Sequence, residues 1–200
     1  MKISKSITVI TLAFTLALGT TTFAQDGSMK KMKKEKMMMQ TKMVGGAEMY
    51  PTKNIIENAV NSKDHTTLVA AVKAAELVET LQGDGPFTVF APTNAAFDKL
   101  PKGTVETLLK PENKEKLQAV LTYHVVPGKV SSMDLVKMIK DGKGKAELTT
   151  VNGGTLTAML KGKKVQLKDA AGNISTVTIA DVNQSNGVIH VVDTVVLPGM

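Results

Sequence analysis

The first part of the chain carries apolar residues at helical spacing. One series predicts a single long helix that Asp64 caps and that ends before Gly83, with Leu68, Ala71, Val72, Ala75, Val78 and Leu81 on its apolar face. A second series predicts a helix that begins at Pro111, with Leu117, Val120, Leu121 and His124 on its apolar face. Shorter helices are expected over residues 54–60, 95–100, 104–109 and 135–139, and Ser131 with Asp134 forms a capping box before the last of them.

From Ala146 onward the period of the apolar residues changes from helix to strand. Strands over residues 148–151 and 155–160 flank an Asn-Gly-Gly turn, which predicts a hairpin, and two more strands are expected over 165–168 and 174–180. The last strand, 188–197, is apolar on both faces, so we expect it at the centre of a sheet that is covered on both sides. Helices followed by strands indicate the α+β fold class.

Residues 85–97 combine a turn, a strand and the start of a helix. A Gly-Pro pair marks the turn, and the residues from Phe87 to Ala91 are mostly β-formers in alternation. Pro92 lacks an amide hydrogen and ends the strand. Thr93 and Asn94 then stand where they can cap the helix that follows, so we expect them to be structural residues of this motif.

Three segments of the chain, in the same order, resemble the fasciclin domain family. They are residues 85–97, Tyr-His-Val-Val-Pro-Gly at residues 123–128, and residues 185–198, in which Asn186, Gly187 and His190 are the expected structural residues. The resemblance covers roughly residues 48–199. It implies a β-wedge of two sheets, with α-helices at the N-terminal side and packed along its edge. It also implies a secreted or surface adhesion or ligand-binding module that is usually not an enzyme.

The first 47 residues differ in composition from the rest of the chain. Residues 1–24 are predicted to be a secretory signal peptide, because Lys2 and Lys5 precede an apolar run that is short for a membrane span, and Thr-Phe-Ala before Gln25 fits a cleavage site. Residues 25–47 are rich in Lys and Met, and we expect them to form a disordered tail. Residues 48–200 then form one fasciclin-like domain, and the mature form is expected to have no transmembrane segment.

Composition argues against several classes of function. The chain has no Cys, which excludes disulfides and thiolate metal sites, and all 25 of its cationic residues are Lys. Lys lacks the planar fork that reads guanine or phosphate, so sequence-specific nucleic-acid binding is not expected. The net charge of +7 comes mainly from the first 43 residues, which leaves the folded part nearly neutral. Cationic attraction of acidic partners is therefore expected from the tail.

The three histidines do not form a catalytic or metal-binding pattern. His65 lies in a polar helix entry and is expected to be solvated. His124 lies on an apolar helix face and His190 inside the most apolar strand, so both are expected in the core, with a lowered pKa for His124. The sequence contains no His-x-x-x-His pair and no Gly-x-Ser-x-Gly elbow. We therefore expect no catalytic residue, no cofactor and no metal site among the histidines.

The function class that remains is recognition of a partner through the protein surface. The fasciclin resemblance suggests two segments for this role. In animal members of the family, the Tyr-His region and a nearby Asp-Ile pair are linked to cell adhesion through integrins. Tyr123 and His124 match the first segment, and Asp181 and Val182 stand at the place of the second. The Glu, Pro and Met of the animal adhesion peptide are missing around Asp181, which argues against an integrin partner. The alternative for Asp181 is a turn residue that bonds its own backbone.

The sequence predicts a secreted, non-catalytic adhesion module in the periplasm, outside the cell or at its surface. Its expected partner is a cell-surface or matrix protein or a polysaccharide, and the Lys-rich tail is a candidate contact for an anionic surface. The alternative is an envelope protein that binds copper or a small ligand. The thioethers of Met37, Met38 and Met39 are the candidate ligands for Cu(I), and a cavity beside His124 is the candidate small-ligand site.

Overall fold

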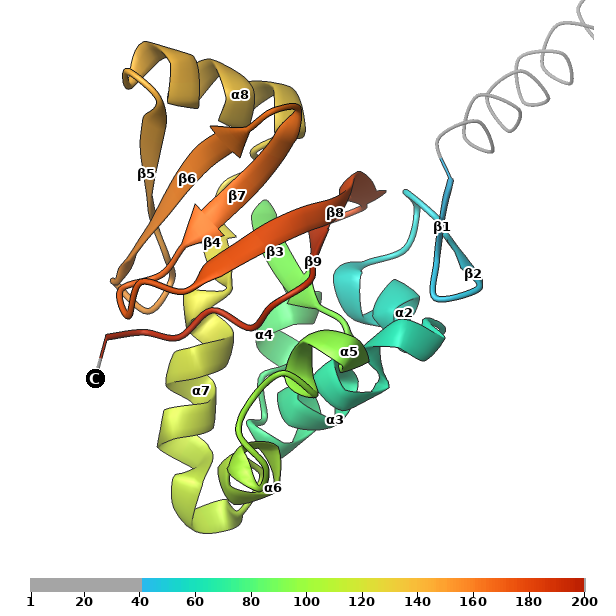
Figure 1. Cartoon of the computed structure of the whole chain (residues 1–200). Coiled ribbons are helices and arrows are strands. Elements are labelled where there is room, and N and C mark those ends of the chain that lie inside the picture. The colour runs from blue at the N-terminus through green and yellow to red at the C-terminus, as the bar shows by residue number, and fades with distance from the viewer. Residues whose placement is uncertain (1–40, 200) are drawn as a thin grey trace, which may run out of the picture. The chain divides into compact units, whose positions relative to one another are not determined.

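The computed structural model describes residues 41–199, in which a group of helices packs against a wedge of strands (Figure 1). The predicted signal peptide, most of the predicted tail and the candidate ligands Met37, Met38 and Met39 lie outside the described residues. The prediction of an α+β wedge is confirmed.

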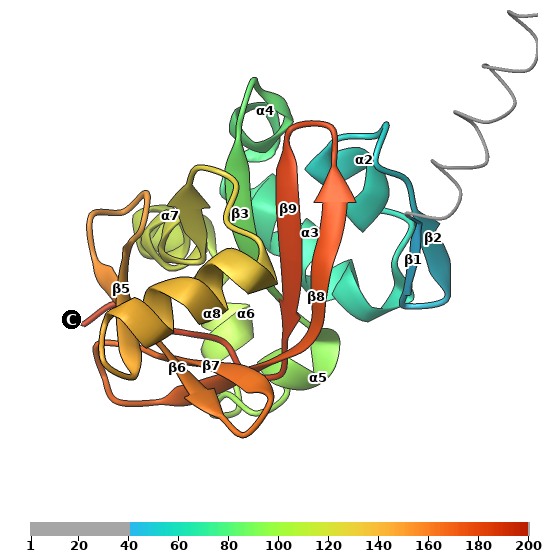
Figure 2. The same ribbon diagram turned by 90° about the horizontal axis from the view of Figure 1, so that it is seen from above.

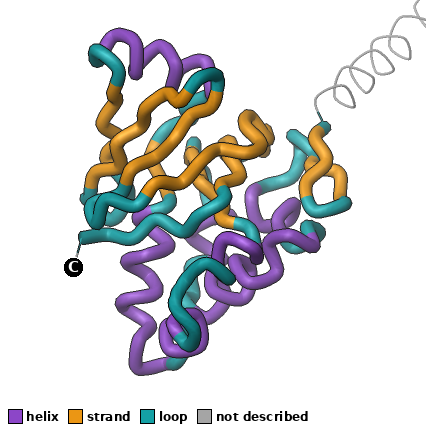
Figure 3. The backbone as a smooth tube through the Cα atoms, viewed as in Figure 1, coloured by secondary structure: helices purple, strands orange, loops and turns teal. Residues whose placement is uncertain are grey.

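Seven α-helices form in the described residues. They are α2 (Ile55–Ala59), α3 (Thr66–Ala74), α4 (Val78–Gln82), α5 (Asn94–Phe97), α6 (Thr104–Leu108), α7 (Lys114–Tyr123) and α8 (Ser132–Asp141), with 3-10 turns at Lys63–His65 and Pro111–Asn113. Figure 3 shows α2 to α7 gathered in the lower half of the view, while α8 lies apart above the strands. The capping box of Ser131 and Asp134 opens α8 as the sequence predicts.

The single long helix predicted across residues 68–81 is wrong. The chain forms α3 and α4 instead, and Glu76 between them has a φ of 56°, which breaks the helical hydrogen-bond series. The apolar periodicity continues through the break because Val72, Ala75 and Leu81 are all buried in one core. A periodic pattern therefore identified the buried face correctly and missed the break within it.

Nine strands form in the described residues. They are β1 (Lys42–Val44), β2 (Ala47–Met49), β3 (Phe87–Pro92), β4 (Val125–Pro127), β5 (Lys145–Thr149), β6 (Thr155–Lys161), β7 (Lys164–Lys168), β8 (Ile174–Gln184) and β9 (Gly187–Val192). Seven of them form one ladder in the order β4-β3-β9-β8-β7-β6-β5, in which β3 and β9 run parallel. The predicted last strand is thus interior, as expected, although it ends at Val192 rather than at residue 197.

The long strand β8 joins the two halves of the wedge. Its first residues, Ile174–Thr176, pair with β7, and the residues from Val177 onward pair with β9. Register shifts between Val177 and Val182 bend the strand at the junction. Figure 2 shows β8 and β9 side by side, with β6 and β7 turned away from them. The two sheets implied by the family resemblance are therefore the two halves of one bent ladder.

The folded domain begins earlier than the sequence analysis placed it. Residues 42–49, most of which were assigned to the disordered tail, form the antiparallel hairpin of β1 and β2. Val44, beside its turn, and Met49, at its open end, are 4% and 3% exposed and belong to the core. Burial of these two side chains supplies the apolar contact that a low-complexity tail would lack. Residues 42–47 therefore belong to the folded part, and the predicted boundary at residue 47 lies too late in the chain.

Two cores lie on opposite faces of β3 and β9. Val89, Ala91, Ile189 and Val191 face the helices, and they pack with residues of α2, α3 and α7. Phe90 and Val192 face the interior of the wedge, where residues of α8 and of β5 to β7 cover them. This alternation explains why β9 is apolar on both faces. Within residues 41–199, no helix has both the length and the apolar character that a membrane span requires.

Candidate functional site

Tyr123 and His124, at the end of α7, are buried rather than displayed. The Tyr123 ring is fully covered, its hydroxyl donates to the carbonyl of Thr155 at 2.7 Å, and it accepts from the amide of Ala170 at 3.2 Å. His124 is 2% exposed and donates from Nδ1 to the carbonyl of Val120. The hydroxyl of Tyr123 thus connects the end of α7 to β6 and to the loop after β7, inside the wedge. The expectation of an adhesion surface at Tyr123 and His124 is therefore corrected.

The hydrogen bonds of His124 fix it as a neutral ring. Nδ1 lies 2.7 Å from the Val120 carbonyl, and Nε2 accepts the amide of Val196 at 3.1 Å, so the proton resides on Nδ1. Burial lowers the pKa of His124 to about 4, and the Val120 carbonyl and the charge of Asp169 oppose this shift only in part. Neutral His124 thus joins the C-terminal segment to α7 through its two hydrogen bonds.

The second predicted segment is also mostly internal. Val182 is 1% exposed, and Asp181 is half-buried in the bend of β8 with a φ of 56°. The Asp181 carboxylate accepts the amide of Ser132 at 2.7 Å and its hydroxyl, so it caps the start of α8. Burial alone would raise the pKa of Asp181, but these bonds from Ser132 outweigh burial and leave that pKa below its ordinary value. Asp181 therefore bonds another element rather than its own turn.

His190 lies under Asp181 in the wedge interior. It donates from Nε2 to the Val130 carbonyl at 2.9 Å and accepts the Asp181 amide at Nδ1. Its ring stacks on Phe90 with centroids 5.6 Å apart. Burial lowers the pKa of His190, so this ring too is a neutral structural group.

Thr93 and Asn94 cap two different helices. The Thr93 hydroxyl accepts the amide of Ala96 and so caps α5. The Asn94 side chain instead accepts the amide of Thr67 at 3.0 Å and donates to the carbonyl of Lys63 at 2.8 Å, which places it at the start of α3. Asp64, the predicted cap of that helix, makes no capping bond. The cap of α3 comes from a residue 27 positions later in the chain.

Asn94→Ala should therefore destabilise α3 rather than its own helix. We expect the free energy of unfolding to fall by about 1–2 kcal/mol, because an amide of α3 loses its acceptor and the Lys63 carbonyl its donor. Urea unfolding measures this change. Asp64→Ala is the matched control and should change the free energy by less than about 0.5 kcal/mol. Equal effects of the two variants would contradict this assignment of the cap.

Asn186 and Gly187 close the other end of the helical layer. The Asn186 side chain accepts the amide of Ile55 at 3.1 Å and donates to the carbonyls of Leu81 and Gly83, so it ties α2 to the end of α4. Gly187 lies against β3, and a Cβ on it would stand 2.1 Å from the carbonyl oxygen of Phe87. Both residues act in the structure as the sequence analysis expects of a structural motif.

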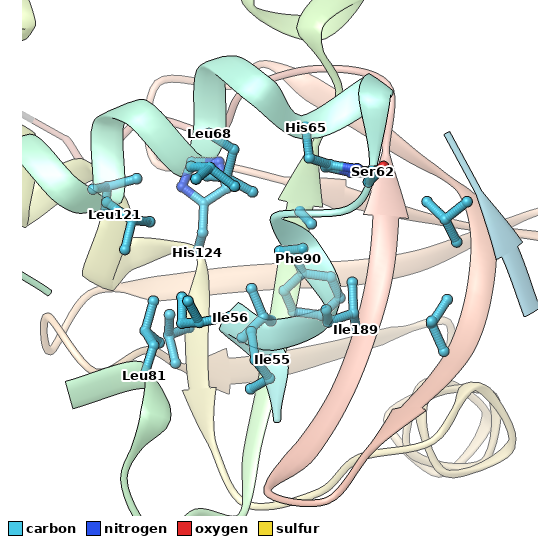
Figure 4. Close-up of a pocket in the computed structure, with 18 of the residues that line it drawn as sticks. Ile55, Ile56, Ser62, His65, Leu68, Leu81, Phe90, Leu121, His124 and Ile189 are labelled. Carbon is cyan, nitrogen blue, oxygen red and sulfur yellow. Dashed lines mark hydrogen bonds between the residues drawn. The ribbon is translucent and has the colours of Figure 1, made fainter. Parts of the chain in front are cut away.

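A cavity of about 50 Å³ lies between α3 and the sheet, and His124 lines it, where the sequence analysis placed its candidate small-ligand cavity. Figure 4 shows side chains that point into it from opposite sides, with His65 and His124 on the side of α3 and Ile55, Ile56 and Leu81 across from them. His65 is 3% exposed, so its predicted solvation is wrong. The ring is drawn inward because the Ser62 hydroxyl pairs with its Nδ1 at 2.9 Å.

A group of lysines at one end of β5, β6 and β7 is a feature that the sequence analysis missed. We define the lysine end as Lys140, Lys143, Lys145, Lys161, Lys163 and Lys164, all of them exposed. Lys145 begins β5 opposite Met159 on β6, and Lys161 pairs with Lys164 across the turn from β6 to β7. The sequence signal for this group is a pair of short Lys-Gly motifs, at residues 140–145 and 161–164. The strand register brings the two motifs together at one end of the sheet.

Residues 41–199 contain no group of three His, Asp or Glu side chains arranged to hold a metal ion. The Met37–Met39 candidates lie outside this range, so copper binding there stays a prediction.

A sequence model of the fasciclin domain matches residues 63–198, which is most of the folded part and more than half of the chain. The chain belongs to the fasciclin domain family. It is 53% identical over 146 residues to protein sll1483 of Synechocystis sp., covering 73% of this chain and 74% of that one. It is also 44% identical to the uncharacterized protein sll1735 of the same organism, covering 73% of this chain and 98% of the relative.

A solved structure shows the same fold. The FAS1 domain pair of the insect cell adhesion molecule fasciclin I superposes with a TM-score of 0.66 at 18% sequence identity, covering 74% of this chain and 52% of that one. The fasciclin resemblance derived from three short segments of the sequence is thus confirmed over residues 63–198.

Proposed function

We propose that this fasciclin domain is a secreted, non-catalytic module that attaches to a surface or matrix, and that its lysine end binds an acidic polysaccharide. The observation that carries this proposal is the concentration of exposed positive charge at one end of the wedge. A role in attachment agrees with the described function of the insect fasciclin I as a cell adhesion molecule.

The lysine end is compact enough to act on one polymer chain. Neighbouring strands lie about 4.8 Å apart, so β5, β6 and β7 span about 10 Å. Lys145 and Lys161 stand at the same end of this sheet, and the loop that carries Lys143 joins α8 to β5 beside them. An extended polyanion that crosses the ends of the three strands would contact several ammonium groups at once.

The charge of the described residues is strongly uneven. The lysine end has six Lys, and Asp141 beside it is paired with Lys137 at 3.2 Å. The other described residues carry eleven Lys, Lys137 excluded, and fifteen acidic residues besides Asp141. The domain is therefore polarised, with a positive end and a negative remainder. Such a field orients a polyanion toward the lysine end.

The chemistry of the lysine end favours a polysaccharide over a membrane. The two turns read Lys-Asp-Gly-Lys-Gly-Lys and Lys-Gly-Lys-Lys, without an apolar or aromatic side chain that could enter a bilayer. Membrane binding by peripheral proteins needs buried apolar area in addition to charge. A hydrated acidic polymer needs charge alone, and flexible Lys side chains suit its repeating carboxylates or sulfates.

The test is binding to an acidic polysaccharide such as alginate by the chain and by a variant with Lys140, Lys145, Lys161 and Lys164 changed to Gln. Each exposed ion pair is worth about 0.2–1 kcal/mol, so four losses should weaken binding about fourfold or more and reduce its dependence on salt. The control changes Lys102, Lys110, Lys116 and Lys168 to Gln, which removes equal charge elsewhere. Equal loss in both variants, or stronger binding to anionic vesicles than to alginate, would contradict the proposal.

The predicted role of the Lys-rich tail at an anionic surface stays a separate prediction, because most of the tail lies outside the described residues. The comparison above isolates the lysine end from the tail, since both variants retain every tail lysine. The proposed location of the mature protein is the periplasm, the medium or the cell surface, as the predicted signal peptide requires.

A further inference from the structure

The cavity beside α3 contains an unpaired polar group that the attachment function leaves unexplained. Among the described residues, Nε2 of His65 is the one buried side-chain nitrogen or oxygen without a hydrogen-bond partner. Buried polar groups in folded proteins are nearly always paired, and an orphan costs free energy of folding. His65 lines the cavity, so a bound molecule could supply the missing partner.

The rest of the cavity wall is mainly apolar, with Ser62 beside His65 and Lys73 at the far end of the lining along α3. It is formed largely by aliphatic residues of α2, α3 and the sheet, among them Ile56, Leu68, Val72, Val89 and Ile189. His124 also lines it, but both of its nitrogens are engaged with Val120 and Val196, so its ring presents only carbon. The cavity therefore has one buried polar group that can bind a ligand, Nε2 of His65, and its wall around that group is mainly hydrocarbon.

The partner of Nδ1 determines what His65 can recognise. The only hydrogen bond of the Ser62 hydroxyl is to Nδ1, and the hydroxyl uses its proton when it donates to this nitrogen. The ring proton then resides on Nε2, which becomes a donor that needs an acceptor. The Ala91 carbonyl lies near enough to favour the charged ring, yet it does not meet hydrogen-bond geometry with Nε2.

The occupant must be uncharged. Burial lowers the pKa of His65, and the Ala91 carbonyl and exposed Asp64 only partly oppose that shift, so the ring is neutral near pH 7. A carboxylate beside a neutral ring would be buried without a counter-charge, which is costly. A ketone, aldehyde or ester oxygen accepts a hydrogen bond without that cost, whereas a pure hydrocarbon would leave Nε2 unpaired.

The size and position of the cavity select an unbranched chain. Its volume of about 50 Å³ is well below the roughly 150 Å³ that accommodates a benzene ring. The lining follows α3 from His65 to Lys73, a distance of about 12 Å along the helix. Less buried lining residues, Ala59, Val69, Lys73 and Val78, provide an entrance between α2, α3 and α4. Because the volume is spread along this length, the slot is narrow, and a single aliphatic chain matches its shape better than a ring does.

We infer that this cavity is a binding site for an unbranched aliphatic chain that carries a carbonyl oxygen, and that Nε2 of His65 donates the hydrogen bond that anchors it. This site is separate from the lysine end, and its test does not depend on polysaccharide binding.

The experiment uses the full chain and two matched probes, pentan-2-one and n-pentane, with binding followed by the NMR signals of the cavity methyl groups. The ketone should bind about three- to tenfold more tightly than the hydrocarbon, which corresponds to one net hydrogen bond. Addition of the ketone should also shift the ring nitrogen Nε2 of His65. Cyclopentanone, with the same number of carbons in a ring, should bind weakly.

The variant Ser62→Ala/His65→Leu removes the anchor together with its partner. It should bind the ketone and the hydrocarbon equally while staying as stable as the wild type or more so, because it removes an orphaned donor. His65→Gln keeps a donor and should retain part of the preference for the ketone. No saturable binding, equal affinities in the wild type, or a ring signal of His65 that the ketone leaves unmoved would each overturn the inference.

Discussion

Replacing His124 with Ala should destabilise the domain by about 3 kcal/mol or more. The change leaves a cavity in the core and removes the partners of two buried backbone groups, the Val120 carbonyl and the Val196 amide. The second loss frees the C-terminal segment from α7. Urea unfolding measures the effect, and Lys116→Ala on the exposed side of α7 is the control, with an expected change below about 0.5 kcal/mol.

The same residue predicts a pH dependence with a definite sign. The folded pKa of about 4 lies below the unfolded value of about 6.5, so the unfolded chain binds the proton more readily between these values. Stability is therefore complete above pH 6.5 and declines as the pH falls toward 4, by up to about 3 kcal/mol. A ring titration by NMR with a pKa at or above 6.5, together with an unchanged His124→Ala stability, would contradict the buried neutral ring.

Gly187→Ala should damage the fold severely although it adds only one methyl group. The new Cβ would stand 2.1 Å from the carbonyl oxygen of Phe87, which belongs to the backbone of β3 and cannot rotate away. The parallel pairing of β3 and β9, which begins at Phe87 and Gly187, would have to open. We expect a loss of about 3 kcal/mol or a failure to fold. Thermal unfolding tests this.

Gly83→Ala is the matched control for that substitution. Its Cβ would lie 3.3 Å from the Thr80 carbonyl, which is a tight but tolerable contact, and its φ is an ordinary −63°. The expected change is about 1 kcal/mol or less. Equal effects of the two substitutions would show that the approach of β9 to β3 is not a constraint.

Local signals in the sequence predicted the elements whose cause is local. The capping box at Ser131 and Asp134 joins residues three apart, and it opens α8 as expected. The two-sided apolar character of residues 188–192 likewise reflects burial on both faces of β9. Two of the three family segments pair with each other in the fold, since residues 87–92 form a parallel pair with residues 187–192.

The sequence misled where a distant residue decides the local structure. Asn94 caps α3 from across the chain, so the choice of Asp64 could not be judged from its neighbours. His65 looked polar and solvated because its helix entry is polar, but Ser62 and the cavity draw its ring inside. Val44 sits in a Met- and Lys-rich stretch, and only the core contact of the hairpin reveals that it is folded.

The candidate site was also decided by residues that are distant in the sequence. Tyr123, His124 and Val182 were candidates for a surface because the family resemblance linked those segments to adhesion, yet all three are buried. For His124 this confirms the competing prediction from its apolar helix face, which placed the ring in the core. The lysine end was visible in the sequence as two separate Lys-Gly turns, and strand register alone joins them. A surface that forms when two distant turns come together cannot be recognised in the sequence before the strand order is known.

The most direct test of the attachment surface is an NMR perturbation map of the labelled chain with an alginate oligosaccharide at physiological salt. Shifts confined to residues 140–145 and 161–164, which weaken together as salt is added, are the result that the account predicts. Shifts centred on residues 123–128 or on the helical layer, with the lysine end unmoved, would contradict it.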